Sequence, residues 1–191
     1  TEKGTRIFLD LKFHDIPNTV GQAVLQAARL GAEFTTVHLC GGKVMLDEID
    51  IKLQEAMLSG QIQKKPRVLG VTVLTSFKEE DWIAAMSHVA KVGSIRNVEE
   101  STMHFAALAN DHPAIGGVVC SPQEINAIRS KHPKLYTMVP GIRPKGFKAH
   151  DQGRIMTPAE ASASARLQSW LVVRSLRRLS HVSLPSRFCR R

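Results

Sequence analysis

Residues 6–20 read RIFLDLKFHDIPNTV, and this stretch decides the fold of the chain. In an extended strand, the aliphatic residues at positions 7, 9 and 11 point to one face, and Asp10 and Lys12 point to the other. Pro17 suits the first turn of a helix, because a proline there gives up no helical hydrogen bond. The stretch therefore predicts a strand that leads into a helix and carries two opposite charges near its carboxyl end.

The charges of Asp10 and Lys12 are unusual for a strand whose flanking sequence predicts burial. The simplest interpretation is an exposed ion pair, but a solvated strand alternates with more polar residues than this one has. Burying a lysine beside carboxylates is costly unless the charges compensate one another. We therefore interpret Asp10, Lys12 and the following Asp15 as part of a functional site.

The order of strand and helix repeats along the chain. Alternation and β-branched residues predict strands over residues 6–12, 34–39, 67–74, 115–119, 135–139 and 170–173. Helical spacing and capping residues, with Ser121 as one N-cap, predict helices over 17–30, 44–58, 81–89, 98–108 and 122–130, and another from Thr157. Apolar strands between helices are typical of a parallel sheet with both faces covered.

Two α/β architectures have such a sheet, an open doubly wound sheet and a (β/α)8 TIM barrel. No glycine-rich dinucleotide fingerprint follows any strand, which disfavours the doubly wound type. Polar residues instead follow several different strands, as barrel enzymes require, so we predict a barrel. Six predicted strands are fewer than the eight of a complete barrel, and we expect the missing ones to precede residue 6, since the chain starts almost directly in a strand.

The net charge of +9 belongs mostly to the last part of the chain. Residues 161–191 hold seven of the 26 basic residues and no acidic one, which leaves 19 basic and 17 acidic residues elsewhere. We predict a partial barrel over residues 1–160 and a divergent Arg/Ser-rich tail after it. The tail composition suggests translation in a shifted reading frame that begins near residues 161–168, which the coding DNA would reveal.

Composition also indicates a compartment and excludes some partners. No apolar run approaches the roughly 18 residues of a membrane span, and no leader opens the chain, so we expect a cytoplasmic protein without membrane contact. Cys40, Cys120 and Cys189 are expected to be reduced thiols. The eight histidines have no metal-type spacing, so no metal site is predicted. Arg174, Arg177 and Arg178 of the basic tail lack the interleaved aromatic residues of a nucleic-acid binder, so that partner is disfavoured.

The sequence DLKFHDIPNT at residues 10–19 resembles the D-x-K-x-x-D signature of orotidine 5′-phosphate decarboxylase, in its bacterial form. Five further motifs of that family follow in order: VHLCGG, VTVLTS, GGVVCS, PGIRP and DQGRIMTPAEA. The resemblance covers about Arg6 to Glu160. It implies a (β/α)8 barrel of the ribulose-phosphate-binding type, a homodimer, and conversion of orotidine 5′-monophosphate to UMP and CO2 in pyrimidine biosynthesis, without metal or organic cofactor.

The resemblance also implies roles for individual residues. Lys12 matches the lysine that protonates C6 as CO2 leaves, Asp10 matches the carboxylate set against the substrate carboxylate, and Asp15 and Thr19 match positions that reach the neighbouring subunit's site. His14 and His38 are interpreted as structural. The substrate-binding residues implied by the resemblance are Asp10, Lys12, Asp15, Ile16, Asn18, Thr19, Thr75, Pro140, Arg143, Gln152 and Arg174.

The chain departs from the family pattern near both ends. Family members have two more strand–helix units before the D-x-K strand, and these carry a further lysine and an aspartate that contacts ribose. The family's last strand ends in Gly-Arg, whereas WLVV before Arg174 lacks that glycine. Three alternatives therefore stay open: an inactive or binding-only, aggregation-prone remnant; a metal-dependent sugar-phosphate decarboxylase or aldolase with the same D-x-K-x-x-D; and a nucleic-acid binder acting through the tail.

Overall fold

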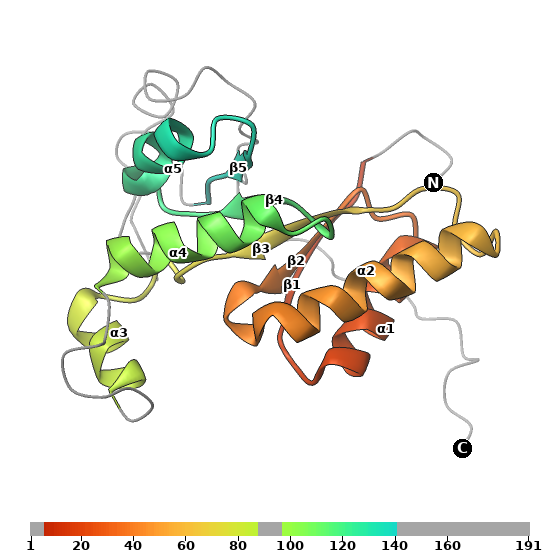
Figure 1. Cartoon of the computed structure of the whole chain (residues 1–191), viewed down its shortest axis with the longest axis horizontal. Coiled ribbons are helices and arrows are strands. Elements are labelled where there is room, and N and C mark those ends of the chain that lie inside the picture. The colour runs from red at the N-terminus through yellow and green to blue at the C-terminus, as the bar shows by residue number, and fades with distance from the viewer. Residues whose placement is uncertain (1–5, 88–96, 141–191) are drawn as a thin grey trace, which may run out of the picture.

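Five parallel strands form the sheet of this chain in the computed structural model, which describes residues 6–87 and 97–140 (Figure 1). The strands are β1 (Phe8–Phe13), β2 (Phe34–His38), β3 (Arg67–Val71), β4 (Ile115–Val119) and β5 (Tyr136–Met138). The helices are α1 (Pro17–Arg29), α2 (Gly42–Leu58), α3 (Glu79–Met86), α4 (Val98–Asp111) and α5 (Ile125–Lys131), with short 3-10 turns at Leu39–Gly41 and Pro122–Glu124.

The order of strands in the described sheet is sequential, β1-β2-β3-β4-β5, and all four pairings are parallel. A doubly wound sheet reverses its strand order at a switch point, and no such reversal occurs among these five strands. Sequential parallel strands joined by helices are the order of a (β/α) barrel. The described sheet therefore confirms the predicted class, α/β with a barrel-type parallel sheet.

Most of the described elements lie where the sequence predicted them. Helix α1 begins at Pro17, β4 has the predicted bounds, and Ser121 caps the turn before α5 in a capping box with Glu124. Strand β3 ends at Val71, three residues early, because the chain then enters a turn closed by the bond from Phe77 N to Leu74 O. The helix predicted from Thr157, the strand over 170–173 and the tail lie outside the described residues.

The two larger parts of the hydrophobic core lie on opposite faces of the sheet, and a third, small cluster joins Val73, Trp82 and Val98. The largest part joins α1, α2, α4 and α5 to the sheet, and it includes the fully buried Leu46 and Ile49 of α2. The part on the other face consists of Phe34, Leu69, Val71, Val119 and Met138, which belong to four neighbouring strands. On β2, Phe34 shares its parity with Thr36 and His38, so these polar side chains stand on the face opposite the main helix layer.

Strand β1 is an edge of the described sheet, and its conformation differs from the prediction. Leu11, expected in a buried aliphatic row, is 57% exposed. The pairing with β2 shifts register between Leu9 and Phe13, and Lys12 has a φ of 50°. This irregularity breaks the two-residue alternation on which the prediction rested, and a strand paired on only one side buries less of its surface. The prediction of a buried β1 is therefore wrong.

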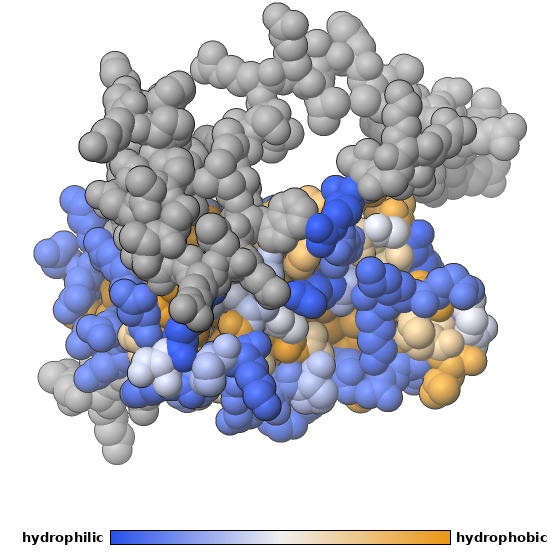
Figure 2. All heavy atoms as spheres, turned by 90° about the horizontal axis from the view of Figure 1, so that it is seen from above, coloured by the Kyte–Doolittle hydropathy of each residue, from blue (hydrophilic) through white to orange (hydrophobic). Residues whose placement is uncertain are grey.

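The described surface is mostly hydrophilic in the view of Figure 2, and hydrophobic residues lie in separate patches between the polar ones. Large exposed hydrophobic side chains include Ile16, Leu30, Val44 and Leu58. None of the described helices combines the length and the apolar character that crossing a bilayer requires.

Candidate active site

Asp10 and Lys12 meet on β1, close to its carboxyl end. Lys12 Nζ donates a hydrogen bond to Asp10 Oδ2 at 2.6 Å, and the two side chains are 37% and 39% exposed, respectively. The predicted pair is therefore present, but the prediction that it is buried is wrong, because the pair stands on an edge strand. A half-exposed ammonium beside a carboxylate can reach a bound molecule and give it a proton. In barrel enzymes, reactive residues lie at this carboxyl edge of the sheet.

A third residue, Thr36 of β2, completes this arrangement. Its hydroxyl donates to Asp10 Oδ1 at 2.9 Å and accepts a hydrogen bond from the backbone N–H of Lys12 at 2.8 Å. The Thr36 side chain is fully buried. Sequence reasoning missed Thr36, although its position on the same face of the neighbouring strand as His38 was a usable signal.

The backbone of Lys12 lies in the left-handed region, with a φ of 50°, where residues other than glycine are strained. A Cβ atom in this region costs roughly 1–2 kcal/mol. The bond from Lys12 N to Thr36 Oγ1 holds the residue in place. A strained residue that carries the reactive group is typical of a functional site.

This conformation predicts an inverted order of stability for two substitutions. Lys12→Gly is expected to unfold at a higher urea concentration than Lys12→Ala, by up to about 1 kcal/mol in the free energy of unfolding, because glycine adopts φ 50° without strain. Both variants lose the ammonium, so that loss cancels. At Leu9, where the strand pairs regularly with Thr35, alanine should be the more stable replacement. If the same replacement, glycine or alanine, were the more stable one at both Lys12 and Leu9, the strain at Lys12 would be contradicted.

His14, His38 and Cys40 form a cluster next to this pair. The two imidazole rings lie 5.5 Å apart, and Cys40 Sγ is 4.0 Å from His14 Nε2. Burial, followed by the nearby His14 and Lys12, lowers the pKa of His38, so its ring is neutral at pH 7. Burial raises the pKa of the Cys40 thiol, which stays protonated. Within residues 6–87 and 97–140, no three His, Cys, Asp or Glu side chains are grouped so as to hold a metal ion.

The other predicted site residues fall into three groups. Asp15, Ile16, Asn18 and Thr19 lie where β1 joins α1, all four exposed, and Asp15 Oδ1 accepts a hydrogen bond from Ile16 N at 2.6 Å. Thr75 and Pro140 follow β3 and β5 and are half-buried, which places them along the same carboxyl edge of the sheet. Arg143, Gln152 and Arg174 lie outside the described residues.

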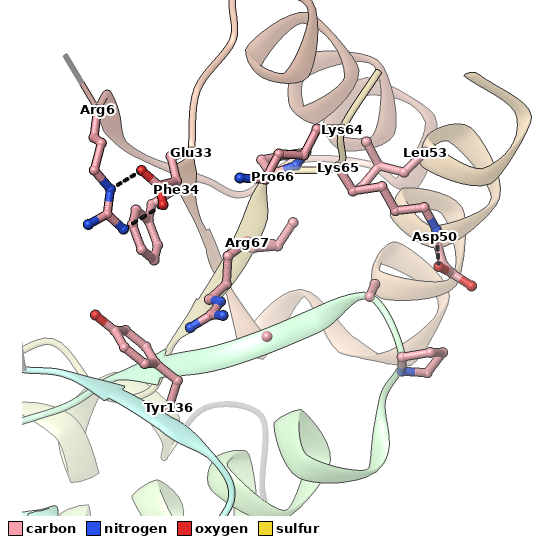
Figure 3. Close-up of a pocket in the computed structure, with 14 residues that line it drawn as sticks. Arg6, Glu33, Phe34, Asp50, Leu53, Lys64, Lys65, Pro66, Arg67 and Tyr136 are labelled. Carbon is pink, nitrogen blue, oxygen red and sulfur yellow. Dashed lines mark hydrogen bonds and ion pairs between the residues drawn. The ribbon is translucent and has the colours of Figure 1, made fainter. Parts of the chain in front are cut away.

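A cavity of about 530 Å³ opens at the opposite, amino-terminal edge of the sheet (Figure 3). The Arg67 guanidinium lies beside two stacked rings, 4.9 Å from the centre of Tyr136 and 5.9 Å from that of Phe34. Arg6 pairs with Glu33, and Lys65 Nζ lies 3.7 Å from Asp50 Oδ1. Arg67, Arg6 and Lys65 thus already have partners within the protein. The amino-terminal edge of a barrel also serves stability rather than chemistry, so we place the candidate site at Asp10 and Lys12.

Comparison with known proteins points in the same direction as the site. The family described as "Orotidine 5'-phosphate decarboxylase / HUMPS family" matches residues 1–168. Orotidine 5′-phosphate decarboxylase of Synechococcus sp. (strain CC9605) is 43% identical over 169 residues, which cover 87% of this chain and 66% of the relative. The chain spans only 61–66% of the length of this and other curated relatives that share the same name.

Solved structures with the same fold include close matches. Orotidine 5′-phosphate decarboxylase from Lactobacillus acidophilus matches with a TM-score of 0.68 and 30% identity, over 89% of this chain and 67% of that one. An uncharacterized conserved protein from Geobacillus kaustophilus matches with a TM-score of 0.68 and 34% identity, over 92% and 70% of the two chains.

Proposed function

The chain belongs to the orotidine 5′-phosphate decarboxylase / HUMPS family, and from this premise we propose that it decarboxylates orotidine 5′-monophosphate to UMP and CO2, a step of pyrimidine biosynthesis. The observation that carries the proposal is the contact of Lys12 Nζ with Asp10 Oδ2 at 2.6 Å. The reaction needs one proton donor beside one fixed negative charge, and these two side chains supply them.

Lys12 is the proposed proton donor. When the bond between C6 of the pyrimidine and its carboxylate breaks, the electron pair stays on C6 and CO2 departs. The ammonium of Lys12 then transfers one proton to C6, which gives UMP. Before that transfer, its positive charge stabilises the negative charge that develops on C6, and a charge fixed in advance does so without the cost of reorganising solvent.

Asp10 has two proposed effects. Its carboxylate faces the substrate carboxylate, so the repulsion between the two negative charges is relieved when the substrate group leaves as neutral CO2 and its electron pair stays on C6. Asp10 also holds the Lys12 ammonium by a direct hydrogen bond, which keeps the proton donor in one position.

The remaining predicted residues complete the proposed substrate site. Ile16, Asn18, Thr75 and Pro140 follow strands at the carboxyl edge of the described sheet, and they are proposed to contact the pyrimidine and ribose. Arg143, Gln152 and Arg174 are proposed for the phosphate, which arginine binds through two parallel N–H groups. Asp15, just before α1, and Thr19, in the first turn of α1, are exposed, as residues that reach a second subunit must be. The proposed enzyme is a cytoplasmic homodimer that works without metal or cofactor.

The proposal is tested by measuring CO2 release from carboxyl-labelled orotidine 5′-monophosphate by the purified chain. Calorimetry with UMP, and in parallel with a hexulose phosphate, separates the nucleotide enzyme from a sugar-phosphate enzyme. We expect turnover of the nucleotide and binding of UMP only. A folded chain that binds UMP without releasing CO2 would identify the binding-only remnant instead, and binding of the sugar phosphate alone would refute the nucleotide as substrate.

A further inference from the structure

The pairing of β1 with β2 leaves one backbone donor of the site without a regular partner. Leu9 pairs with Thr35 and Phe13 with Val37, so the three residues 10–12 of β1 stand opposite the single residue Thr36. The N–H of Lys12 in this bulge bonds to the Thr36 hydroxyl, at 2.8 Å. A side chain of β2 thus takes the place that a backbone carbonyl has in a regular ladder.

The direction of both bonds made by Thr36 is fixed by chemistry. An amide N–H can only donate, so the Thr36 oxygen must accept the bond from Lys12 N. The single hydroxyl proton is then available for Asp10 Oδ1, 2.9 Å away. Asp10 Oδ2 is left for Lys12 Nζ. Each carboxylate oxygen therefore has one assigned donor, and the plane of the carboxylate is held from two sides.

We propose that Thr36 is a positioning residue for the decarboxylation assigned above, on which this inference depends. Its hydroxyl fixes the Asp10 carboxylate and the backbone of Lys12 together, and so sets where the ammonium stands. Thr36 lies buried beneath the pair and does not itself touch the substrate. Without its hydroxyl, Asp10 loses one donor, Lys12 loses the bond that holds its strained backbone, and the ammonium is no longer confined to one place.

The test compares Thr36→Val, which keeps the shape of the side chain but removes the hydroxyl, with Thr36→Ser, which keeps the hydroxyl. Thr36→Val is expected to lower kcat by roughly tenfold to a hundredfold, since small displacements of a reacting group cost about that much. KM and the Kd of UMP should stay within about threefold, because the substitution removes none of the side chains that are proposed to bind the substrate. Thr36→Ser should restore most of kcat.

Thr35 provides the matched control on the same strand. It is as fully buried as Thr36, but its hydroxyl has no hydrogen-bond partner among the described residues, and its side chain points to the other face of the sheet. Thr35→Val should leave kcat unchanged. If Thr36→Val proves too unstable to assay, Thr36→Ser and Thr36→Ala provide a second pair that differs only by the hydroxyl.

Two outcomes would overturn the proposal: an unchanged kcat in folded Thr36→Val, or equal losses of kcat in the serine and alanine variants. A readout that needs no turnover keeps the test separate from the proposed function. Hydrogen exchange at the amide of Lys12 should quicken at least about tenfold in Thr36→Val and stay slow in Thr35→Val. If the Lys12 amide exchanges faster in Thr36→Val while the wild-type chain shows no turnover, the proposed reaction is refuted but the positioning of Lys12 by Thr36 is not.

Discussion

Replacing Lys12 by alanine is expected to lower kcat for decarboxylation of orotidine 5′-monophosphate by roughly 10³- to 10⁴-fold, the upper range for losing a general acid. The variant removes the only ammonium that the described structure places against Asp10, and with it the proton for C6. The negative charge of Asp10 then stands uncompensated beside the substrate carboxylate, which weakens binding as well. The measurement is the initial rate of CO2 release at saturating substrate.

Lys43→Ala is the matched control for this experiment. The Lys43 side chain is 70% exposed and pairs with Asp47 one turn along α2, so its loss removes an ordinary surface ion pair. Its kcat should stay within about twofold of the wild-type value. If Lys12→Ala retains a tenth or more of the wild-type kcat, Lys12 does not deliver the proton.

The sequence alone correctly predicts the elements that depend on short-range features of the chain. The bounds of β4 and the start of α1 at Pro17 follow from short-range features, an apolar run between turn residues and a proline at a first helical turn. The pairing of Asp10 with Lys12 is equally local, since the two residues are only two positions apart, although the bulge of β1 departs from the regular alternation of a strand. Such features need no knowledge of the neighbouring strands.

Other features depend on contacts that a single strand does not encode. The bulge of β1 arises from its register with β2, and it gives Lys12 a φ that no residue pattern in DLKF indicates. The same register brings Thr36 to Asp10 across 26 positions of sequence. Leu11 is exposed because β1 has a neighbour on one side only within the described sheet, whereas periodicity alone assigned it to a buried row.

The two edges of the sheet use charge in different ways. At the amino edge, Arg6 pairs with Glu33 and Arg67 stacks on Tyr136, so both guanidinium groups have partners within the protein. At the carboxyl edge, the Lys12 ammonium has one carboxylate partner and remains 37% exposed. An ammonium has three protons to donate, so Lys12 can hold Asp10 and still reach a substrate. This difference is the reason for placing the candidate site at Asp10 and Lys12 and not at the cavity of the amino edge.

Replacing Ile49 by alanine is expected to lower the free energy of unfolding by about 2–5 kcal/mol, the cost of emptying space in a packed core. Ile49 is fully buried where α2 packs on α1 and the sheet, and a domain is stable by only about 5–15 kcal/mol. Ile51, two residues along α2, is 48% exposed, so Ile51→Ala should cost well under about 1 kcal/mol. Urea denaturation followed by circular dichroism measures both variants. Equal losses at the two positions would mean that α2 does not present Ile49 to the core, and the assignment of the helix layer would have to be abandoned.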